Sequence, residues 1–187
     1  MPPKAKTDRN KIVNAAFDLV RECGVQNLSA RAIAERLACS TQPVLYHFKT
    51  VDEIRAAVIQ KADSYHSDYI MRDIEASENP MLAMGSNYIK FGYEEKNLFR
   101  LLFQMSNYSG QMTGLFEDDR LLPILAVLSE RLSCSTARAR CVFITLFAAA
   151  HGVASLLANN ALEYDEEQSI AILNAAYYGA INSGEGK

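Results

Sequence analysis

Residues 28–54, LSARAIAERLACSTQPVLYHFKTVDEI, contain the signals for two short helices joined by a tight turn. Ser29 is a good N-cap for the first helix, which ends near Leu37, because its hydroxyl can accept a hydrogen bond from a free backbone N–H group. The second helix begins around residues 40–41. Pro43 lies in its first turn, where a missing N–H group breaks no hydrogen bond. This stretch therefore predicts a helix, a turn and a second helix.

Helical signals continue on both sides of this stretch. Before it, apolar residues from Ile12 to Val20 recur with helical spacing, and Gly24 follows as a natural C′ residue. After it, Thr50 and Glu53 form a capping box, which indicates that a long helix begins at Thr50. The further helices are predicted at approximate residues 50–72, 80–93, 97–103, 119–132, 136–159 and 165–182. The expected caps of three of them are Asn79, Asn97 and Asp165.

Alternating patterns typical of strands are nearly absent, so we expect an all-α fold of about nine helices. The stretch 106–114 contains two glycines and several turn-forming residues, which predicts a loop. The expected organisation is an N-terminal three-helix unit over residues 1–50, followed by a larger C-terminal helical bundle over residues 51–187.

The predicted N-terminal unit matches the requirements of a helix-turn-helix. Such a unit presents one face of its second helix to the major groove of DNA, while the other face packs on the supporting helices. The residues expected to pack inward are Val44, Leu45 and Phe48. The residues expected on the free face are Gln42, Pro43, Tyr46 and His47. Glutamine can bind adenine, proline can contact a thymine methyl group, and tyrosine, histidine or the following Lys49 can contact phosphates.

This region resembles the DNA-binding region of the TetR family of bacterial transcriptional regulators over residues 8 to 55. The pattern of that family is a first helix ending in Gly, then Ser/Thr-x-Arg-x-Ile-Ala, a turn, and a recognition helix that closes with Tyr-His-Phe. The matching residues are Gly24, Ser29, Arg31, Ile33, Ala34, Tyr46, His47 and Phe48. The resemblance implies a DNA-binding site made of Ser29, Arg31, Thr41, Gln42, Pro43, Tyr46, His47 and Lys49.

The resemblance also implies a role for each group of residues in this site. Ser29 and Arg31 meet the DNA backbone or a base edge, and residues 41–43 face the bases. Tyr46 and His47 hold phosphates. The ordinary structural alternatives are exposed polar side chains at 41 and 42, a solvated charge at 31, and packing against the next helix at 46 and 47.

The sequence departs from the family pattern at three positions. Leu45 stands where many members have an aromatic residue, and Val51 stands where many have a lysine. Ala38 replaces the glycine of the turn. We expect Lys49 and the basic arm at residues 4–11 to supply the missing contacts to the DNA backbone.

The overall net charge of −3 conceals an uneven distribution. Residues 1–49 contain eight Lys and Arg against four acidic residues, whereas the remaining residues contain eleven against eighteen. This asymmetry favours a polyanionic partner for the N-terminal unit alone.

The C-terminal part is expected to bind a small molecule, as the resemblance implies. Residues 88–103 and 148–162 resemble the effector domain of one TetR subgroup, in which the penultimate helix carries His-Gly. The candidate ligand-binding residues are Tyr88, Phe91, Phe103, Tyr108, Phe147 and His151. Ligand pockets are usually apolar with a few polar groups, so we expect an apolar or aromatic effector. The alternative is a packed aromatic core with His151 hydrogen-bonded inside it.

The last two predicted helices are rich in small residues, which allow helices to approach closely. This composition favours a homodimer in which two helices from each chain pack together. The residues concerned are Ala148, Ala149, Ala150, Gly152, Ala154, Ala175, Ala176, Gly179 and Ala180. A twofold dimer would place two recognition helices about one DNA turn (~34 Å) apart on a pseudo-palindromic double-stranded operator. The resemblance implies a repressor that a small molecule releases, with the long helix from Thr50 as the lever.

Other classes of function find little support in the sequence. No motif of an enzyme, a metal site or a cofactor site occurs, so we expect none of these. The four cysteines lack a C-x-x-C spacing, which favours reduced thiols in a cytoplasmic protein. They are Cys23, Cys39, Cys134 and Cys141. Two alternatives stay open: a redox-responsive regulator that uses Cys39 or Cys134, and a small-molecule-binding protein with weakened DNA binding.

Residues 141–158 carry no formal charge, so a membrane-spanning helix has to be considered. Eighteen residues lie at the lower limit for a span, and Thr145, His151 and Ser155 interrupt the apolar run. The N-terminus is basic and polar and does not resemble a signal peptide. We therefore expect a buried helix and no membrane partner.

Overall fold

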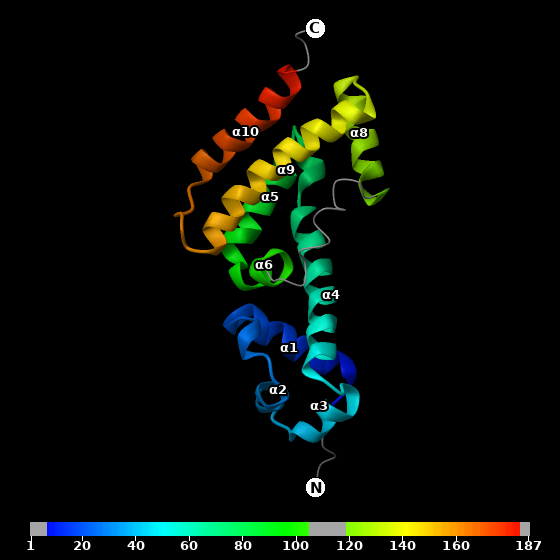
Figure 1. Cartoon of the computed structure of the whole chain (residues 1–187), viewed down its shortest axis with the longest axis vertical. Helices are drawn as coiled ribbons and strands as arrows, with labels where there is room; N and C mark the ends of the chain where they lie inside the picture. Colours follow the sequence, from blue (N-terminus) through cyan, green and yellow to red (C-terminus); the bar gives the residue numbers. More distant parts are fainter. Residues whose placement is uncertain (1–6, 105–118, 184–187) are drawn as a thin grey trace.

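The computed structural model of the chain describes residues 7–104 and 119–183, and Figure 1 shows their arrangement. These residues form nine α-helices and no strand, which confirms the expected all-α fold. The helices are α1 (Arg9–Cys23), α2 (Ala30–Arg36), α3 (Thr41–His47), α4 (Val51–Ile70), α5 (Pro80–Glu94), α6 (Lys96–Phe103), α8 (Leu122–Leu132), α9 (Thr136–Ala158) and α10 (Glu166–Asn182). The expected loop at 106–114 lies outside the described residues.

Most of the expected helix caps form as hydrogen bonds between a side chain and the first turn. Backbone N–H groups donate to Ser29 in α2, Thr50 in α4, Asn79 in α5 and Asp165 in α10. Glu53 adds a second bond at the start of α4, because its carboxylate accepts the backbone N–H of Lys49 at 2.8 Å. These caps satisfy backbone donors that have no partner inside the helix.

The expected cap at Asn97 is wrong. Helix α6 begins at Lys96, so Asn97 lies inside its first turn. The Asn97 amide instead donates to the backbone carbonyls of Arg21 and Glu22, at 3.0 and 3.3 Å. These carbonyls belong to the last turn of α1, where carbonyl groups lack partners within the helix. Asn97 therefore joins α6 to the end of α1.

The helices form two regions that α4 connects. Figure 1 shows α1, α2 and α3 at one end of the molecule and α5, α8, α9 and α10 at the other, with α4 running from the first region into the second. Helix α1 packs against α4 and α6, whereas α9 packs against α5, α8 and α10. Helix α6 lies between the two regions, since it contacts both α1 and α9.

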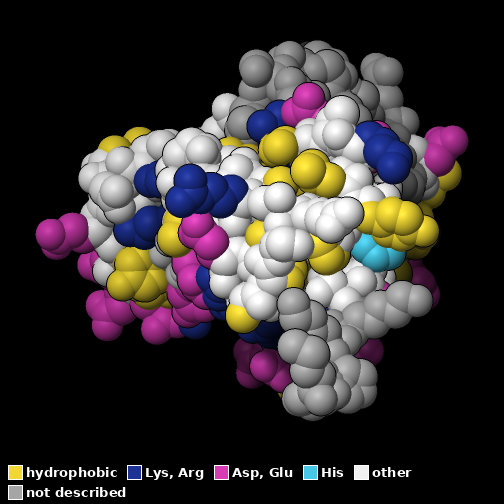
Figure 2. Space-filling view, turned by 90° about the horizontal axis from the view of Figure 1, so that it is seen from below, with side chains coloured by type: hydrophobic (Ala, Val, Ile, Leu, Met, Phe, Trp, Pro, Cys, Tyr) yellow, Lys and Arg dark blue, Asp and Glu magenta, His cyan; other side chains and the backbone are white. Residues whose placement is uncertain are grey.

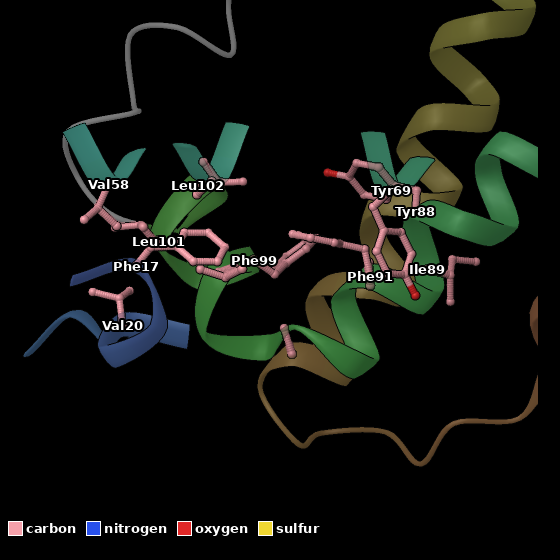
Figure 3. Close-up of a cluster of buried hydrophobic side chains, with 14 of the residues drawn as sticks. Phe17, Val20, Val58, Tyr69, Tyr88, Ile89, Phe91, Phe99, Leu101 and Leu102 are labelled. Atoms are coloured by element: carbon pink, nitrogen blue, oxygen red, sulfur yellow. The ribbon is translucent and has the colours of Figure 1, made fainter. Parts of the chain in front are cut away.

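One continuous apolar core passes through both regions. It includes Phe17 and Val20 of α1, Leu101 and Phe99 of α6, and Tyr88 of α5. Figure 3 shows these side chains in a row, with Phe99 between the α1 side and the α5 side. The division at residue 50 stays a prediction, and the core crosses that division without a break.

The inward face of α3 is narrower than expected. Val44 and Phe48 are buried, but Leu45 is 49% exposed, so its expected inward packing is wrong. Residues four apart lie one above the other on a helix, whereas the next residue along is turned by about 100°. Because α3 has only seven residues, this single row anchors it to the helices behind it.

Helix α9 is the one helix within residues 7–104 and 119–183 whose length and hydropathy would suffice to cross a membrane. Its packing provides another explanation for that composition. It lies among α5, α8 and α10, and it crosses α5 closely at Gly92. A Cβ atom added at Gly92 would come within 2.7 Å of the Cβ atom of Ala154. Helix α9 is thus a central helix of the bundle, but one of its faces is exposed rather than buried as expected.

Candidate DNA interface and ligand site

The end of the molecule that carries α3 presents a row of polar and aromatic side chains. Thr41, Gln42 and Lys49 are exposed, and Pro43 is half-buried. Tyr46 is 75% exposed, so it does not pack against α4. Figure 2 views this end and shows Lys and Arg side chains in separate groups rather than one continuous basic patch. The free face of α3 therefore matches the sequence prediction, with Leu45 added to it.

Tyr46 and Lys49 lie together at the end of α3. The Lys49 ammonium donates to the backbone carbonyl of Tyr46 at 3.5 Å and lies 6.0 Å from the centroid of its ring. Both side chains are exposed, so a partner can reach them without a rearrangement of the protein. An exposed tyrosine and an exposed lysine at the end of one helix are both suited to contact phosphates.

His47 is less available than its neighbour. Its ring is half-buried and meets the Tyr46 ring edge-on at 5.1 Å. Its Nε2 atom lies 3.3 Å from the backbone oxygen of Thr7. His47 at the end of α3 therefore contacts Thr7, which lies two residues before the start of α1.

Ser29 and Arg31 lie at the start of α2. The Ser29 hydroxyl caps the helix by accepting the N–H of Ala32 at 3.1 Å, and its own hydrogen is left to donate. Arg31 pairs with Glu35 at 2.9 Å, and both side chains are largely exposed. An exposed pair of this kind is weak, so Arg31 can exchange it for another anion.

The turn between α2 and α3 contains a strained residue. Ala38 has a φ angle of 50°, in the left-handed region that glycine adopts more readily. The backbone N–H of Cys39 donates to Ala34 at 2.9 Å and closes the end of α2. Ala38, which stands in place of the turn glycine of the family pattern, thus adopts a backbone conformation that glycine favours.

The second candidate site is a cluster of aromatic rings inside the bundle. Tyr88, Phe103, Phe147 and His151 come together there, as expected. The Tyr88 hydroxyl and the Nδ1 atom of His151 form a hydrogen bond of 2.9 Å. Burial raises the pKa of Tyr88 and lowers the pKa of His151, so both groups are neutral at pH 7.

Two expected members of this cluster, Phe91 and Tyr108, are not among these four residues. Phe91 is fully buried and reaches the cluster through His66, with ring centroids 4.8 Å apart, so it belongs to the wall behind the site. Tyr108 lies outside the described residues. The partly exposed edge of the cluster is formed by Phe103, Phe147 and His151.

His66 on α4 is a member of the cluster that the sequence prediction missed. It is 9% exposed, and its ring meets the rings of Tyr88 at 5.4 Å and Phe103 at 5.1 Å. Burial lowers its pKa to about 4. The available signal was its place in the inward stripe Ile54, Val58, Ala62, His66 of α4, which recurs every four residues.

A buried carboxylate between α5 and α6 joins these helices to α1. Glu95, which is 6% exposed, accepts a hydrogen bond from Nε of Arg21 at 2.7 Å, and a second guanidinium nitrogen pairs with its other oxygen. The Tyr65 hydroxyl of α4 donates to the same carboxylate at 2.9 Å. Hydrogen bonding to Glu95 raises the pKa of Arg21 above its ordinary value. We call Arg21, Glu95, Tyr65 and Asn97 the joint.

No protein-family model and no curated protein matches this sequence. Solved structures do match over nearly the whole chain. A transcriptional regulator from Rhodococcus sp. Rha1 is 23% identical with a TM-score of 0.66, covering 95% of this chain and 97% of its own. A TetR-like transcriptional regulator from Rhodococcus sp. RHA1 is 18% identical with a TM-score of 0.62, covering 95% and 96%.

A third matching structure carries a bound small molecule. It is the multidrug binding protein EbrR complexed with imidazole, 20% identical with a TM-score of 0.59, covering 90% of this chain and 88% of its own. At these low identities, the similarity establishes the fold. The chain thus has the fold of TetR-like transcriptional regulators.

Proposed function

We propose that this chain is a ligand-responsive transcriptional regulator that binds double-stranded DNA as a homodimer. A small molecule in the helical body releases it from a pseudo-palindromic operator, so it acts as a repressor. The observation that carries this proposal is α3, whose row of Val44 and Phe48 is anchored while its opposite face is exposed. A helix held in this way can enter the major groove.

The exposed face of α3 supplies two kinds of contact to DNA. Thr41, Gln42 and Pro43, in its first turn, face the bases, where glutamine discriminates adenine by two hydrogen bonds. Tyr46 and Lys49 at its other end contact phosphates. His47 reaches the same strand beside Tyr46. Ser29 and Arg31 contact the backbone from the start of α2, where free N–H groups favour anions.

The dimer forms through α9 and α10, whose outer faces are uncovered in the single chain. The exposed apolar and small residues on these faces include Ala148, Gly152, Leu156, Ile170, Ala175, Tyr178 and Gly179. A Cβ atom added at Gly152 or Gly179 would meet no atom within 4 Å. A flat apolar face of this kind is suited to close helix packing with a second copy.

The effector binds at the aromatic cluster. Tyr88 and His151 offer polar atoms within an otherwise apolar environment, which is the usual composition of a ligand site. Phe91, Phe103 and Phe147 supply its aromatic walls. We expect an aromatic effector, because rings at this site can stack or pack edge-on against it.

Helix α6 couples this site to the DNA-binding end. Its first turn and the preceding Glu95 hold α1 through the joint. Phe103 at its other end belongs to the aromatic cluster, and the Phe99 ring contacts the Phe103 ring. Helix α4 runs beside it and contributes both Tyr65 and His66. A ligand that favours a shifted position of α6 therefore shifts α1–α3 in the same equilibrium.

The function implies a cytoplasmic location, where the free thiols of all four cysteines would stay reduced. We propose no catalytic activity for the chain.

The test is a fluorescence anisotropy titration with DNA that flanks the coding sequence of the protein. We expect sequence-dependent binding whose affinity falls steeply with salt, because phosphate contacts release counterions. Gln42→Ala should lose discrimination among sequences, while Gln60→Ala, at an exposed position of α4, should bind as the wild type does. Weak binding that is indifferent to sequence and salt would contradict the proposal. Sedimentation analysis of Gly152→Glu, which should be monomeric, tests the dimer.

A further inference from the structure

We infer that the effector is an uncharged aromatic molecule with one hydrogen-bonding group, that its ring takes the place of the Phe103 ring, and that its polar group binds Nε2 of His66. This inference rests on the proposed effector site and specifies what that site accepts. It also assigns a binding role to His66, which the sequence pattern alone did not indicate.

The first observation is an unpaired polar atom in the core. Nε2 of His66 is buried and has no hydrogen-bond partner among the residues that the structure describes. Leaving a buried polar group unpaired has a free-energy cost, because the group has lost its hydrogen bonds to water. Such groups are rare in native proteins, and each calls for an explanation. A ligand group that binds this nitrogen would remove the cost.

The second observation is the set of rings around His66. The rings of Tyr88, Phe91 and Phe103 all meet it nearly edge-on, with centroids 4.8–5.4 Å away. Tyr88 and Phe91 are buried, and each lies within α5. Phe103 is half-buried and is the last residue of α6. It is therefore the ring of the three that can move with the least loss of packing.

The third observation is the position of Phe103 between the polar groups of the site. Its ring lies 5.1 Å from His66, 5.7 Å from Tyr88 and 5.9 Å from His151. A ligand ring in the same place would keep these aromatic contacts. Phe103 itself offers the imidazole no polar atom. A hydroxyl or amino group on a ligand ring in the same place would offer His66 a hydrogen-bonding partner.

The electrostatics of the site select against a charged ligand. His66 and His151 are neutral at pH 7, since burial lowers the pKa of both. The rings that contact His66 within the described residues, those of Tyr88, Phe91 and Phe103, carry no charge. An ion placed there would lose its hydration without gaining a counter-charge. A hydroxyl group suits the neutral imidazole, because it can donate or accept.

The test compares three compounds of one shape: 2-naphthol, naphthalene and 2-naphthoate. The protein contains no tryptophan, so naphthyl fluorescence can be followed without interference from it. We expect the wild-type protein to bind 2-naphthol, to bind naphthalene roughly fivefold more weakly, and to bind 2-naphthoate weakest of all. The nitrogen NMR resonance of His66 Nε2 should shift with 2-naphthol and not with naphthalene.

Three variants separate the contributions. His66→Phe keeps a ring and removes the nitrogen, so the preference for 2-naphthol over naphthalene should disappear. His66→Gln keeps a hydrogen-bonding group and should retain part of the preference. A retained preference would show that substitution at this position does not unfold the site. Phe103→Ala vacates the site and should bind both naphthyl compounds more tightly than the wild type. Tyr93→Phe, at an exposed position of α5, is the matched control.

Two results would overturn the inference. One is equal binding of 2-naphthol and naphthalene by the wild-type protein, or no binding of either. The other is an unchanged preference in His66→Phe. DNA titration of the same samples distinguishes this failure from failure of the proposed function. A protein that binds its operator but shows either result refutes the inference alone, whereas one that binds 2-naphthol through His66 but no DNA refutes the regulator.

Discussion

The two candidate sites use aromatic and polar side chains in opposite ways. At the tip of α3, Tyr46 is three-quarters exposed, and its neighbours Gln42 and Lys49 are open to solvent. In the body, Tyr88 and His66 are buried among other rings. The first site is ready to contact a partner as it stands. On the inference above, the second has to open, because the Phe103 ring packs against the His66 ring where the ligand ring would lie.

On the proposed function, this difference would let one chain combine a rigid DNA-binding surface with an adjustable ligand site. The α3 face derives its shape from two buried anchors, so its exposed residues can vary without loss of the fold. The aromatic cluster contains a buried polar atom, Nε2 of His66, that has no hydrogen-bond partner among the described residues. Helix α6 touches both regions, so a change at the aromatic cluster has a direct structural route to α1.

The largest expected effect comes from breaking the joint between the two regions. Arg21→Ala leaves Glu95 buried beside Tyr65 without its cation, which should lower the free energy of unfolding by about 3 kcal/mol. Chemical denaturation measures this loss. Arg21→Lys keeps the charge and should lose less, since it cannot form the two-pronged pair. A loss below about 0.5 kcal/mol for Arg21→Ala would show that Glu95 is solvated in solution.

The next prediction concerns the buried histidine of the body. The folded-state pKa of His66 is about 4 against an ordinary value of 6.5, so the unfolded chain binds more protons between these pH values. Stability contributed by neutral His66 is therefore complete above about pH 6.5 and is lost as the pH falls to 4. The loss should total about 3 kcal/mol.

His66→Phe is the control for this pH dependence. It has no imidazole to protonate, so its stability should fall less between pH 6.5 and 4 than that of the wild type. Part of the fall should persist, because burial also lowers the pKa of His151. Thermal or chemical unfolding at each pH measures both proteins. Identical pH profiles would mean that His66 is not buried as described.

A third prediction addresses the exposed site. Gln42→Ala should weaken operator binding by about 1–3 kcal/mol and relax specificity at one base pair, because a two-pronged contact is removed. Lys49→Ala should weaken binding to all sequences alike and reduce the slope of affinity against salt by about one phosphate contact. Anisotropy titrations across a range of salt measure both. Loss of specificity in Lys49→Ala but not in Gln42→Ala would reverse the assignment.

The smallest expected effect lies in the turn that aims α3. Ala38→Gly should raise the free energy of unfolding by about 0.5 kcal/mol, because glycine adopts the left-handed backbone of this position without a steric penalty. DNA affinity should stay as in the wild type, since the backbone conformation is kept. Denaturation and anisotropy titration together check this prediction. A gain in stability with a loss of DNA binding would indicate that the turn has changed its direction.

Much of the fold follows from signals that lie within a few residues of one another. Ser29, Thr50 and Asp165 cap helices whose first turns they precede directly, so no distant partner is needed to recognise them. The same holds for the exposed first turn of α3, with Thr41 and Gln42. The exposure of Leu45 was not predicted, because its hydropathy resembles that of Val44. Which side of a seven-residue helix is buried depends on the helices that pack behind it.

The sequence therefore specifies the helices, their order and the side chains that α3 offers to a partner, because caps, turns and helical periodicity act over short distances. Only the tertiary structure decides the joint and the environment of His66. Arg21 meets Glu95 across 74 positions of the chain, and His66 meets Phe103 from another helix. The pairing of such residues, and the burial that shifts the pKa of His66, arise only when the helices pack.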